Sequence, residues 1–419
     1  MTTVSTVFDT TAANAALKEL YDGQAVENLV YADNPFLALV PKSTDFGGKY
    51  YPIPIISGVS QGRSATFATA QANITAPLIE SFLLTRVKDY SVAQISNELM
   101  EASRTDKMAF LQGSKTNIDA AIRSLTNSIA SALFRSGSGT IGKIAAAGIT
   151  SGVITLDDPS TVTQFEVNMV LEASGTDGGA AYSGTAPLGY VIKVDRTAGT
   201  ITVASSGFGG TAASPNNGGG NWAAADYLRV QGDRNAKCSG LAGWFPTTAP
   251  VLGSDSFYGV DRGGDPTRLA GVRYDGSSQS IEEALIDGSM YLSREGGKPN
   301  VAIMSYTSYG ALEKALGAKA QYVEWKGPAE IMFRGIRLNG YNSEIKVFPD
   351  RSCPGAKCYL LQMDTLKLLS LTECPHIIRG DGLDMLRAST SDAYEVRVAA
   401  YYNLACNAPG WNAVVSLAQ

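Results

Sequence analysis

The chain has 419 residues, with 34 lysines and arginines against 39 aspartates and glutamates, and a pI near 5.2. This length predicts two to four domains, and the weakly acidic balance argues against duplex binding, which requires a clustered basic face. No apolar run of about 20 residues occurs, so the sequence predicts no membrane span. Residues 1–11 are polar and lack a secretory-signal pattern, so we expect an intracellular origin.

The N-terminal segment is weakly helical. Residues 12–31 carry apolar side chains at approximate helical spacing with a break at Gly23, and Asn34-Pro35 is expected to stop any helix. Because this stretch cannot enclose a core alone, it predicts an arm that lies on another part of the structure.

A long hairpin is predicted next. Residues 48–58 form an extended run in which Pro52 and Pro54 each remove a ladder donor, as in an edge strand. A return strand is predicted over 77–95, and the small and polar residues 59–76 between them predict a flexible tip. A hairpin exposed on both faces needs a partner molecule to cover it, which indicates assembly.

Residues 104–135 give the strongest helical signal. Apolar residues recur with one-face spacing at Leu111, Ile118, Ile122, Leu125, Ile129 and Leu133. A helix of about 32 residues would be about 48 Å long, which favours a structural spine, and Gly137 is expected to end it.

The amino-acid composition changes over residues 138–235. Gly, Thr, Ser and Ala dominate, and short strands are predicted at 152–156, 165–173, 189–195, 199–204 and 226–230. Several short strands separated by turn residues predict a small β-barrel or sandwich inserted into the main fold.

The remaining chain predicts mixed α/β structure. Ser280 and Glu283 form a capping box for a helix over 281–294, with Gly296-Gly297 after it. A buried strand is predicted over 301–304, a helix over 308–316, and a hairpin joined through Asn339-Gly340. Further strands are predicted at 358–363, 366–371 and 393–404.

The motifs that could indicate catalysis, nucleotide binding or metal binding are better explained as structural features. Gly58-Val-Ser-Gln-Gly62 matches a nucleophile elbow, but no amphipathic helix follows it and His376 is the only histidine. The glycine pattern over 137–142 matches a dinucleotide fingerprint but follows a helix and precedes a β-rich region, so we interpret it as a linker. Five cysteines do not form a disulfide framework, and Cys353 and Cys358 have no second pair for zinc. We therefore expect no enzyme activity, no cofactor and no metal.

The order of these segments resembles the major capsid proteins of tailed bacteriophages, the Hong Kong 97-like fold. The stretches that carry the resemblance are 16–41 with its Asn-Pro-Phe, the extended segment 47–103, and the strand and capped helix over 298–315. The resemblance covers most of the chain. It implies an α+β fold with these parts: an N-terminal arm (1–45), an extended β-hairpin loop (46–95), a spine helix of the peripheral domain (96–137), an inserted β-rich domain (138–235), a peripheral-domain return (236–275), an axial α/β domain (276–385) and C-terminal peripheral-domain strands (386–419).

The resemblance also implies a function. Such proteins self-assemble as hexamers and pentamers into the icosahedral head that encloses double-stranded DNA, so the chain is expected in the virion capsid after assembly in the host bacterial cytoplasm. The DNA is expected to make only weak non-specific contact, and the inserted domain is expected on the outer surface.

Two departures shape the expected partners. Some relatives link subunits through a Lys–Asn isopeptide bond, but Val59 to Val87 contains no lysine, so we expect non-covalent contacts or a decoration protein. Only about 45 residues precede the hairpin, so scaffolding is expected from a separate protein, or from a segment removed from this chain; a portal is the other expected partner.

Four residues are predicted to contact other subunits: Arg63 and Phe67 at the hairpin tip, and Phe8 and Phe36 in the arm. Axis-facing loops such as 317–328 are expected to contribute as well. Two alternatives stay open. One is an encapsulin, a bacterial compartment with the same fold, and the other is a β-rich adhesin or glycosidase, which predicts a signal peptide and a paired-carboxylate cleft.

Overall fold

The computed structural model describes residues 34–98, 107–218, 220–317, 321–326, 332–378, 386–388 and 391–418. Most of the predicted N-terminal arm, including Phe8, therefore lies outside the described residues, as does part of the loop 317–328. The chain divides into two compact units, and each is described by itself. Unit 1 comprises Met1–Ala38, Val87–Cys238 and Thr372–Tyr402, and unit 2 comprises Leu39–Arg86, Ser239–Leu371 and Asn403–Gln419.

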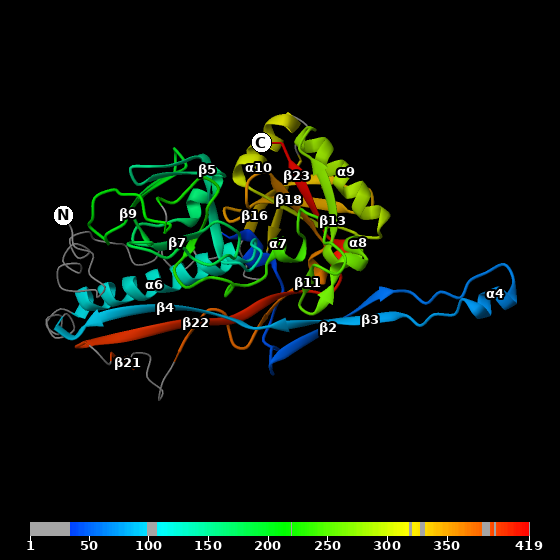
Figure 1. Ribbon diagram of the computed structural model, residues 1–419, viewed down its shortest axis with the longest axis horizontal. Helices are drawn as coiled ribbons and strands as arrows, with labels where there is room; N and C mark the ends of the chain where they lie inside the picture. The colour runs from blue at the N-terminus through cyan, green and yellow to red at the C-terminus, as the bar shows by residue number, and fades with distance from the viewer. Residues whose placement is uncertain are drawn as a thin grey trace. The chain divides into compact units, whose positions relative to one another are not determined.

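Unit 1 is built on a long helix and a long pair of strands (Figure 1). Helix α6 (Lys107–Ala132) packs against β4 (Val87–Ser96), which pairs antiparallel with β22 (Ala393–Cys406). Leu125, Ile129 and Leu133 are buried on the predicted face of the helix. The helix ends at Ala132, three residues before the predicted end. Two further short strands pair with β22: β20 (His376–Ile377) and β21 (Leu386–Arg387).

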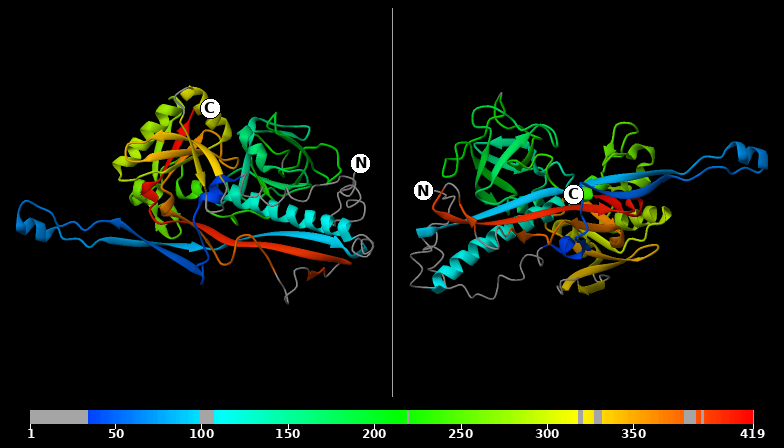
Figure 2. Two further views of the ribbon diagram at one scale, coloured as in Figure 1. Left: turned by 180° about the vertical axis from the view of Figure 1, so that it is seen from behind. Right: turned by 90° about the horizontal axis from the view of Figure 1, so that it is seen from below.

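The inserted segment folds as a closed barrel. Its strands follow the order β10-β5-β6-β9-β8-β7. The bounds are β5 (Thr140–Thr150), β6 (Val153–Leu156), β7 (Val170–Ser174), β8 (Gly189–Asp195), β9 (Thr200–Ala204) and β10 (Tyr227–Val230), with the 3₁₀ helix η2 (Pro159–Gln164). The barrel lies on one side of α6, and β4 and β22 lie on the other (Figures 1 and 2).

Two predictions within the barrel need correction. The linker assigned to 137–142 is wrong, because β5 begins at Thr140; Gly142 sits in that strand with the Phe165 ring 2.9 Å from the position of a Cβ atom. The predicted strand over 165–173 starts only at Val170, because Phe165 caps the 3₁₀ helix and is buried.

Unit 2 contains a seven-stranded sheet of order β13-β23-β18-β14-β17-β16-β15. The bounds are β13 (Val272–Gly276), β14 (Val301–Met304), β15 (Gln321–Lys326), β16 (Met332–Asn339), β17 (Glu344–Pro349), β18 (Lys357–Leu361) and β23 (Ala413–Leu417). Since β13 and β23 belong to this sheet, the sheet extends beyond the predicted axial range 276–385, and the predicted C-terminal range 386–419 contributes to both units.

Two helices of the sheet domain match their sequence signals. Helix α9 (Ile281–Arg294) begins with the predicted capping box, in which the Ser280 hydroxyl accepts from the Glu283 N–H and the Glu283 carboxylate accepts from the Ser280 N–H. It packs against β13 and β23. Helix α10 (Tyr306–Leu316) begins two residues before the predicted start.

The other short elements of the described chain are α3 (Pro35–Leu39), β1 (Lys42–Ser43), β2 (Tyr50–Gly58), α4 (Phe67–Ala72), β3 (Leu78–Thr85), α7 (Leu241–Trp244), β11 (Ser256–Phe257), β12 (Val260–Asp261), η3 (Arg262–Gly264), α8 (Pro266–Ala270), η5 (Met363–Thr365), β19 (Leu366–Ser370) and η6 (Pro409–Trp411). Asn34-Pro35 therefore starts a short helix, which agrees with the preference of proline for the first helical position.

The predicted return strand 77–95 is two strands. β3 pairs with β2, whose first residue Tyr50 lies opposite Thr85, so β2 offers no partner beyond that point. After Arg86 the chain continues as β4, which pairs with β22 instead. Arg86 is the residue between the two strands, and its guanidinium donates to the Phe46 carbonyl at 3.2 Å.

Candidate functional site

The β2–β3 hairpin of unit 2 is held at its base by apolar packing. Ile53, Phe82 and Leu84 are buried. The Phe82 ring makes edge contacts with Trp244 and Phe257, with centroids 5.2 and 6.2 Å away. The base is therefore fixed to the loop and strands that follow residue 239.

Backbone hydrogen bonds at the base show how the two strands face each other. The Leu83 N–H donates to the Tyr258 carbonyl at 2.9 Å, and the Thr85 carbonyl accepts from the Asn403 amide at 2.6 Å. Both groups point away from β2. Opposed residues in an antiparallel pair point either both inward or both outward, so Pro52, opposite Leu83, faces outward, as does Pro54 two residues on.

The predicted edge strand is confirmed, because among the described strands β2 pairs only with β3, in a two-stranded sheet. The prolines remove no bond between β2 and β3, and instead delete two successive donors from the outer edge of β2. Such an edge resists pairing with a further strand. A partner at the β2 side of the hairpin is therefore expected to contact side-chain faces or the tip rather than to pair as a strand.

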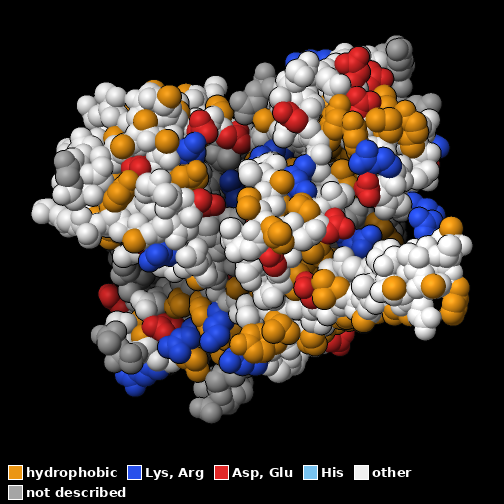
Figure 3. Space-filling model, turned by 45° about the vertical axis from the view of Figure 1, so that its right-hand side comes forward, with side chains coloured by type: hydrophobic (Ala, Val, Ile, Leu, Met, Phe, Trp, Pro, Cys, Tyr) orange, Lys and Arg blue, Asp and Glu red, His pale blue; other side chains and the backbone are white. Residues whose placement is uncertain are grey.

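The outer half of the hairpin exposes apolar side chains. In Figure 3 they are spread over the projecting hairpin, at the lower right, among uncharged polar surface. The exposed large hydrophobic residues of this outer part are Ile56, Val59, Phe67, Ile74, Leu78 and Ile79, and Tyr50 and Leu83 are half-exposed at the base. Exposed apolar area of this kind marks contact surfaces in soluble proteins.

The tip is ordered by local bonds rather than by a core. The Gln61 N–H donates to the Thr75 hydroxyl at 2.8 Å, and the Thr75 N–H donates to the Gln61 carbonyl at 2.7 Å. Helix α4 follows between them and buries none of its residues. The predicted flexible tip thus contains a helical turn, which presents Phe67 to solvent.

The two predicted tip residues lie where a partner could reach them. Phe67 is 83% exposed, and Arg63 is exposed and makes no ion pair within the part of the chain that the structure describes. Their role as contact residues stays a prediction. Sequence reasoning placed the contact tip at Ser60 to Ile74 and missed Ile56, Leu78 and Ile79, because alternation cannot identify the buried face of a hairpin that is exposed on both faces.

Phe36 is placed differently from Phe67. Its side chain is buried in unit 1 and packs against Phe134 with ring centroids 5.1 Å apart. In this structure it supports the chain's own core, and its role as a contact residue stays a prediction. The unbroken apolar run Pro35–Leu39 is the sequence feature that could have indicated this burial. Phe8 lies outside the described residues.

The residues considered above for catalysis or metal binding do not form a site within the described residues. Ser60 of the elbow-like motif is exposed in the hairpin and precedes no strand-to-helix turn. The His376 ring nitrogen Nδ1 lies 3.0 Å from the Thr372 hydroxyl and 3.1 Å from the Glu373 carbonyl. The five cysteines are present as thiols rather than disulfides, and burial raises the pKa of the Cys406 thiol to about 12. Within the described ranges no three His, Cys, Asp or Glu side chains gather as metal ligands, and no helix there is long and apolar enough to cross a membrane.

Comparison with known proteins identifies the fold. No protein-family model and no curated protein matches the sequence. Among solved structures, the cyanophage A-1(L) capsid asymmetric unit matches with a TM-score of 0.53 and 16% identity, over 97% of this chain and 99% of that chain. The predicted α+β fold of phage capsid proteins is thereby confirmed.

Two further matches have lower scores. The capsid of a native GTA particle matches with a TM-score of 0.44 and 10% identity, over 96% of each chain. The SrpI encapsulin from Synechococcus elongatus PCC 7942 matches with a TM-score of 0.42 and 10% identity, over 96% of this chain and 94% of that chain. Because both scores are below 0.5, the fold assignment rests on the cyanophage structure.

Proposed function

We propose that this chain is a phage major capsid protein, which self-assembles as hexamers and pentamers into the icosahedral head that encloses double-stranded DNA. The fold shared with the cyanophage A-1(L) capsid supports this proposal. The observation that carries it is the hairpin, which is fixed at its base and uncovered along its outer half.

The hairpin favours self-association for an energetic reason. Eight large apolar side chains are exposed over residues 50–83. Complete burial of a fully exposed apolar side chain contributes about 1.5–3 kcal/mol, so each of these contributes up to that amount, in proportion to the area that a neighbour covers. A second copy of the chain is the partner proposed here, with the hairpin lying over the neighbouring subunit. The prolines at the outer edge of β2 disfavour strand pairing on that edge, so contact on that side is made by faces and tip.

The role proposed is structural rather than catalytic. The sequence has one histidine, whose ring nitrogen contacts the Thr372 hydroxyl and the Glu373 carbonyl, so it is not arranged with an acid and a nucleophile. No cofactor is required for assembly. A separate scaffolding protein, a portal and a decoration protein are the proposed partners, and the virion capsid is the proposed location.

The barrel is proposed to stand on the outer surface of the shell. It lies on the side of α6 opposite to β4 and β22 (Figure 1), so one of these two faces would point outward and the other toward the DNA. A barrel on the inner side would take up packaging volume. A tag inserted at residues 215–220 should be accessible on intact particles, and an inaccessible tag would contradict this placement.

Assembly is tested by expressing the full chain and separating the products by size. Closed shells, or five- and six-subunit rings, are expected by electron microscopy. Nuclease-protected DNA in particles from the producing host would support the phage head, whereas shells that hold a protein cargo instead would favour a compartment of the encapsulin type.

A further inference from the structure

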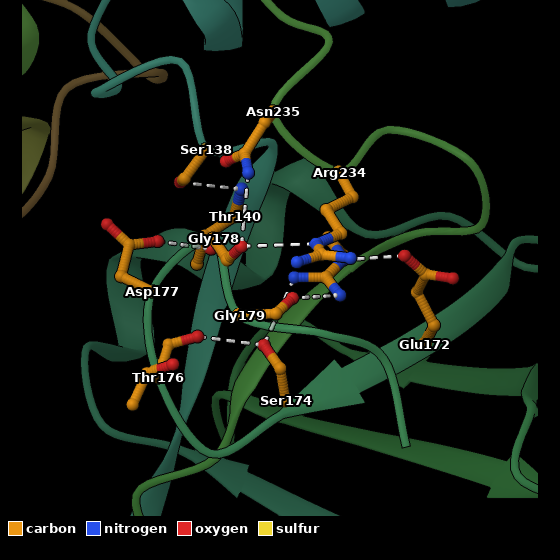
Figure 4. Close-up of polar contacts among 11 residues, drawn as sticks. Ser138, Thr140, Glu172, Ser174, Thr176, Asp177, Gly178, Gly179, Arg234 and Asn235 are labelled. Carbon is orange, nitrogen blue, oxygen red and sulfur yellow. Dashed lines mark hydrogen bonds and ion pairs between the residues drawn. The ribbon is translucent and has the colours of Figure 1, made fainter. Parts of the chain in front are cut away.

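The inserted barrel is attached to the rest of unit 1 by two segments that run side by side. The Asn235 N–H donates to the Ser138 carbonyl at 3.0 Å, and a Cβ atom at Gly139 would lie 2.2 Å from the Asp233 carbonyl oxygen. The loop at Gly178 is tied to the outgoing segment, because the Gly178 carbonyl accepts from the side chains of both Asn235 and Arg234 (Figure 4). The segments 136–140 and 233–237 are called the barrel mount below.

A second tie connects this loop to the incoming segment. The Thr140 hydroxyl donates to Asp177 at 2.6 Å (Figure 4). The Ser136 hydroxyl donates to the same carboxylate at 3.2 Å. The mount is therefore a compact bonded region and not a flexible linker.

One lysine connects the mount to the helix and strand of unit 1. The Lys237 ammonium donates to Asp89 of β4 at 2.7 Å and to Ser128 of α6 at 2.8 Å. It also lies 3.3 Å from the Asp233 carboxylate, within the mount itself. The side chains of Lys237, Asp89 and Asp233 are only 10, 11 and 23% exposed.

The cluster holds one positive charge and two negative charges away from water. The other ionisable groups around it do not restore the balance. Glu172 of β7 is already paired with Arg229 at 2.6 Å. Tyr402 of β22 is buried and neutral, and its hydroxyl finds no hydrogen-bond partner among the described residues; the thiols of Cys238 and Cys374 also lie near that ring.

A buried excess of negative charge favours uptake of a proton. Asp233 is the carboxylate expected to take it, because its contact with Lys237 is the longer one. Burial raises the pKa of Asp233 to about 6, and the negative charges of Asp89 and Glu172 act in the same direction against the opposing effect of Lys237.

We propose that the barrel mount is a proton-responsive clamp. A proton from solvent binds the Asp233 carboxylate, and Lys237 is then shared only by Asp89 and Ser128. The cluster becomes neutral, so the tie from the outgoing segment to β4 and α6 tightens in mild acid. At neutral pH the two carboxylates compete for one ammonium, and the mount is looser.

Amide hydrogen exchange on the full chain tests this clamp, with all samples in one assembly state. The reporters are peptides that cover 233–238, whose Asn235 and Ala236 amides bond to Ser138 and Asp233. After correction for intrinsic exchange rates, protection of these amides is expected to rise about tenfold from pH 7.5 to pH 5. The rise follows because the pKa of Asp233 is about 6 in the closed clamp and 3.8 when the clamp opens. Peptides from β8 and β9 serve as the internal reference.

Two variants make the result specific. Asp233→Asn should show at pH 7.5 the protection that the wild type reaches at pH 5, with no further change on acidification. Asp195→Asn removes an exposed carboxylate of the barrel, whose pKa is lowered by the Ala198 N–H, and should leave the tenfold rise intact. Equal wild-type protection at both pH values would overturn the proposal, and that comparison requires no variant to fold.

Discussion

Replacing Phe67 with alanine separates assembly from folding. The side chain is 83% exposed and α4 buries none of its residues. An exposed substitution of this kind changes the free energy of unfolding by at most about 0.5 kcal/mol. Complete burial of a phenylalanine against a neighbour contributes about 1.5–3 kcal/mol, so losing this contact should cost about 2 kcal/mol. That corresponds to an association constant about 30-fold weaker for each contact.

The assay is the protein concentration at which shells or rings appear, followed by light scattering and size-exclusion chromatography. The threshold for Phe67→Ala should rise while the melting temperature stays within about 2 °C of the wild type. Val153→Ala, an exposed apolar residue of the barrel, is the matched control and should leave the threshold unchanged. If Phe67→Ala assembles at the wild-type threshold, the reasoning from the exposed tip is refuted.

Three further predictions concern stability, and denaturant unfolding of the unassembled chain checks each of them. Phe82→Ala removes the buried ring at the hairpin base and should destabilise unit 2 by about 3–5 kcal/mol; a loss below about 1 kcal/mol would contradict the proposed anchor. Ser280→Ala removes the side-chain half of the capping box of α9 and should cost about 1 kcal/mol, whereas Ser280→Asp should retain most of that stability. Because burial raises the pKa of Asp233 from 3.8 to about 6, the folded chain binds the extra proton between these values, so its stability falls as pH rises through that window. Asp233→Asn should remove this slope and stabilise the protein at pH 7.5 by up to about 3 kcal/mol, and an unchanged slope would contradict the assignment.

The parts of the fold that depend on local pattern were predictable. The capping box at Ser280 and Glu283, the buried strand over 301–304 and the helix face of Leu125, Ile129 and Leu133 follow from periodicity and from the hydrogen-bonding needs of helix ends. Each signal lies within a few residues of the element that it predicts, so it can be recognised without knowledge of distant contacts.

The parts that depend on distant contacts were not predictable. The change from β3 to β4 at Arg86 is set by β22, about 300 residues later in the chain, and alternation runs through it without a break. Strand β5 was missed because its centre, Ala145–Gly148, has low strand propensity; closure of the barrel places it between β6 and β10.

The candidate site was predicted in outline but not in detail. Helix formers over Phe67–Ala72 after Thr66 could have indicated the turn at the hairpin tip. The outward direction of Pro52 and Pro54 requires the hydrogen bonds at Leu83 and Thr85, which only the structure provides. Phe36 has the same residue type as Phe67 and the opposite environment, because the apolar stretch around it packs into a core.

The central claim is that this chain builds a shell from copies of itself. Size-exclusion chromatography with negative-stain microscopy tests it most directly, on the full chain expressed alone and together with its neighbouring genes. Closed icosahedral shells, or five- and six-subunit rings, are the predicted result. A well-behaved monomer in both preparations would contradict the claim.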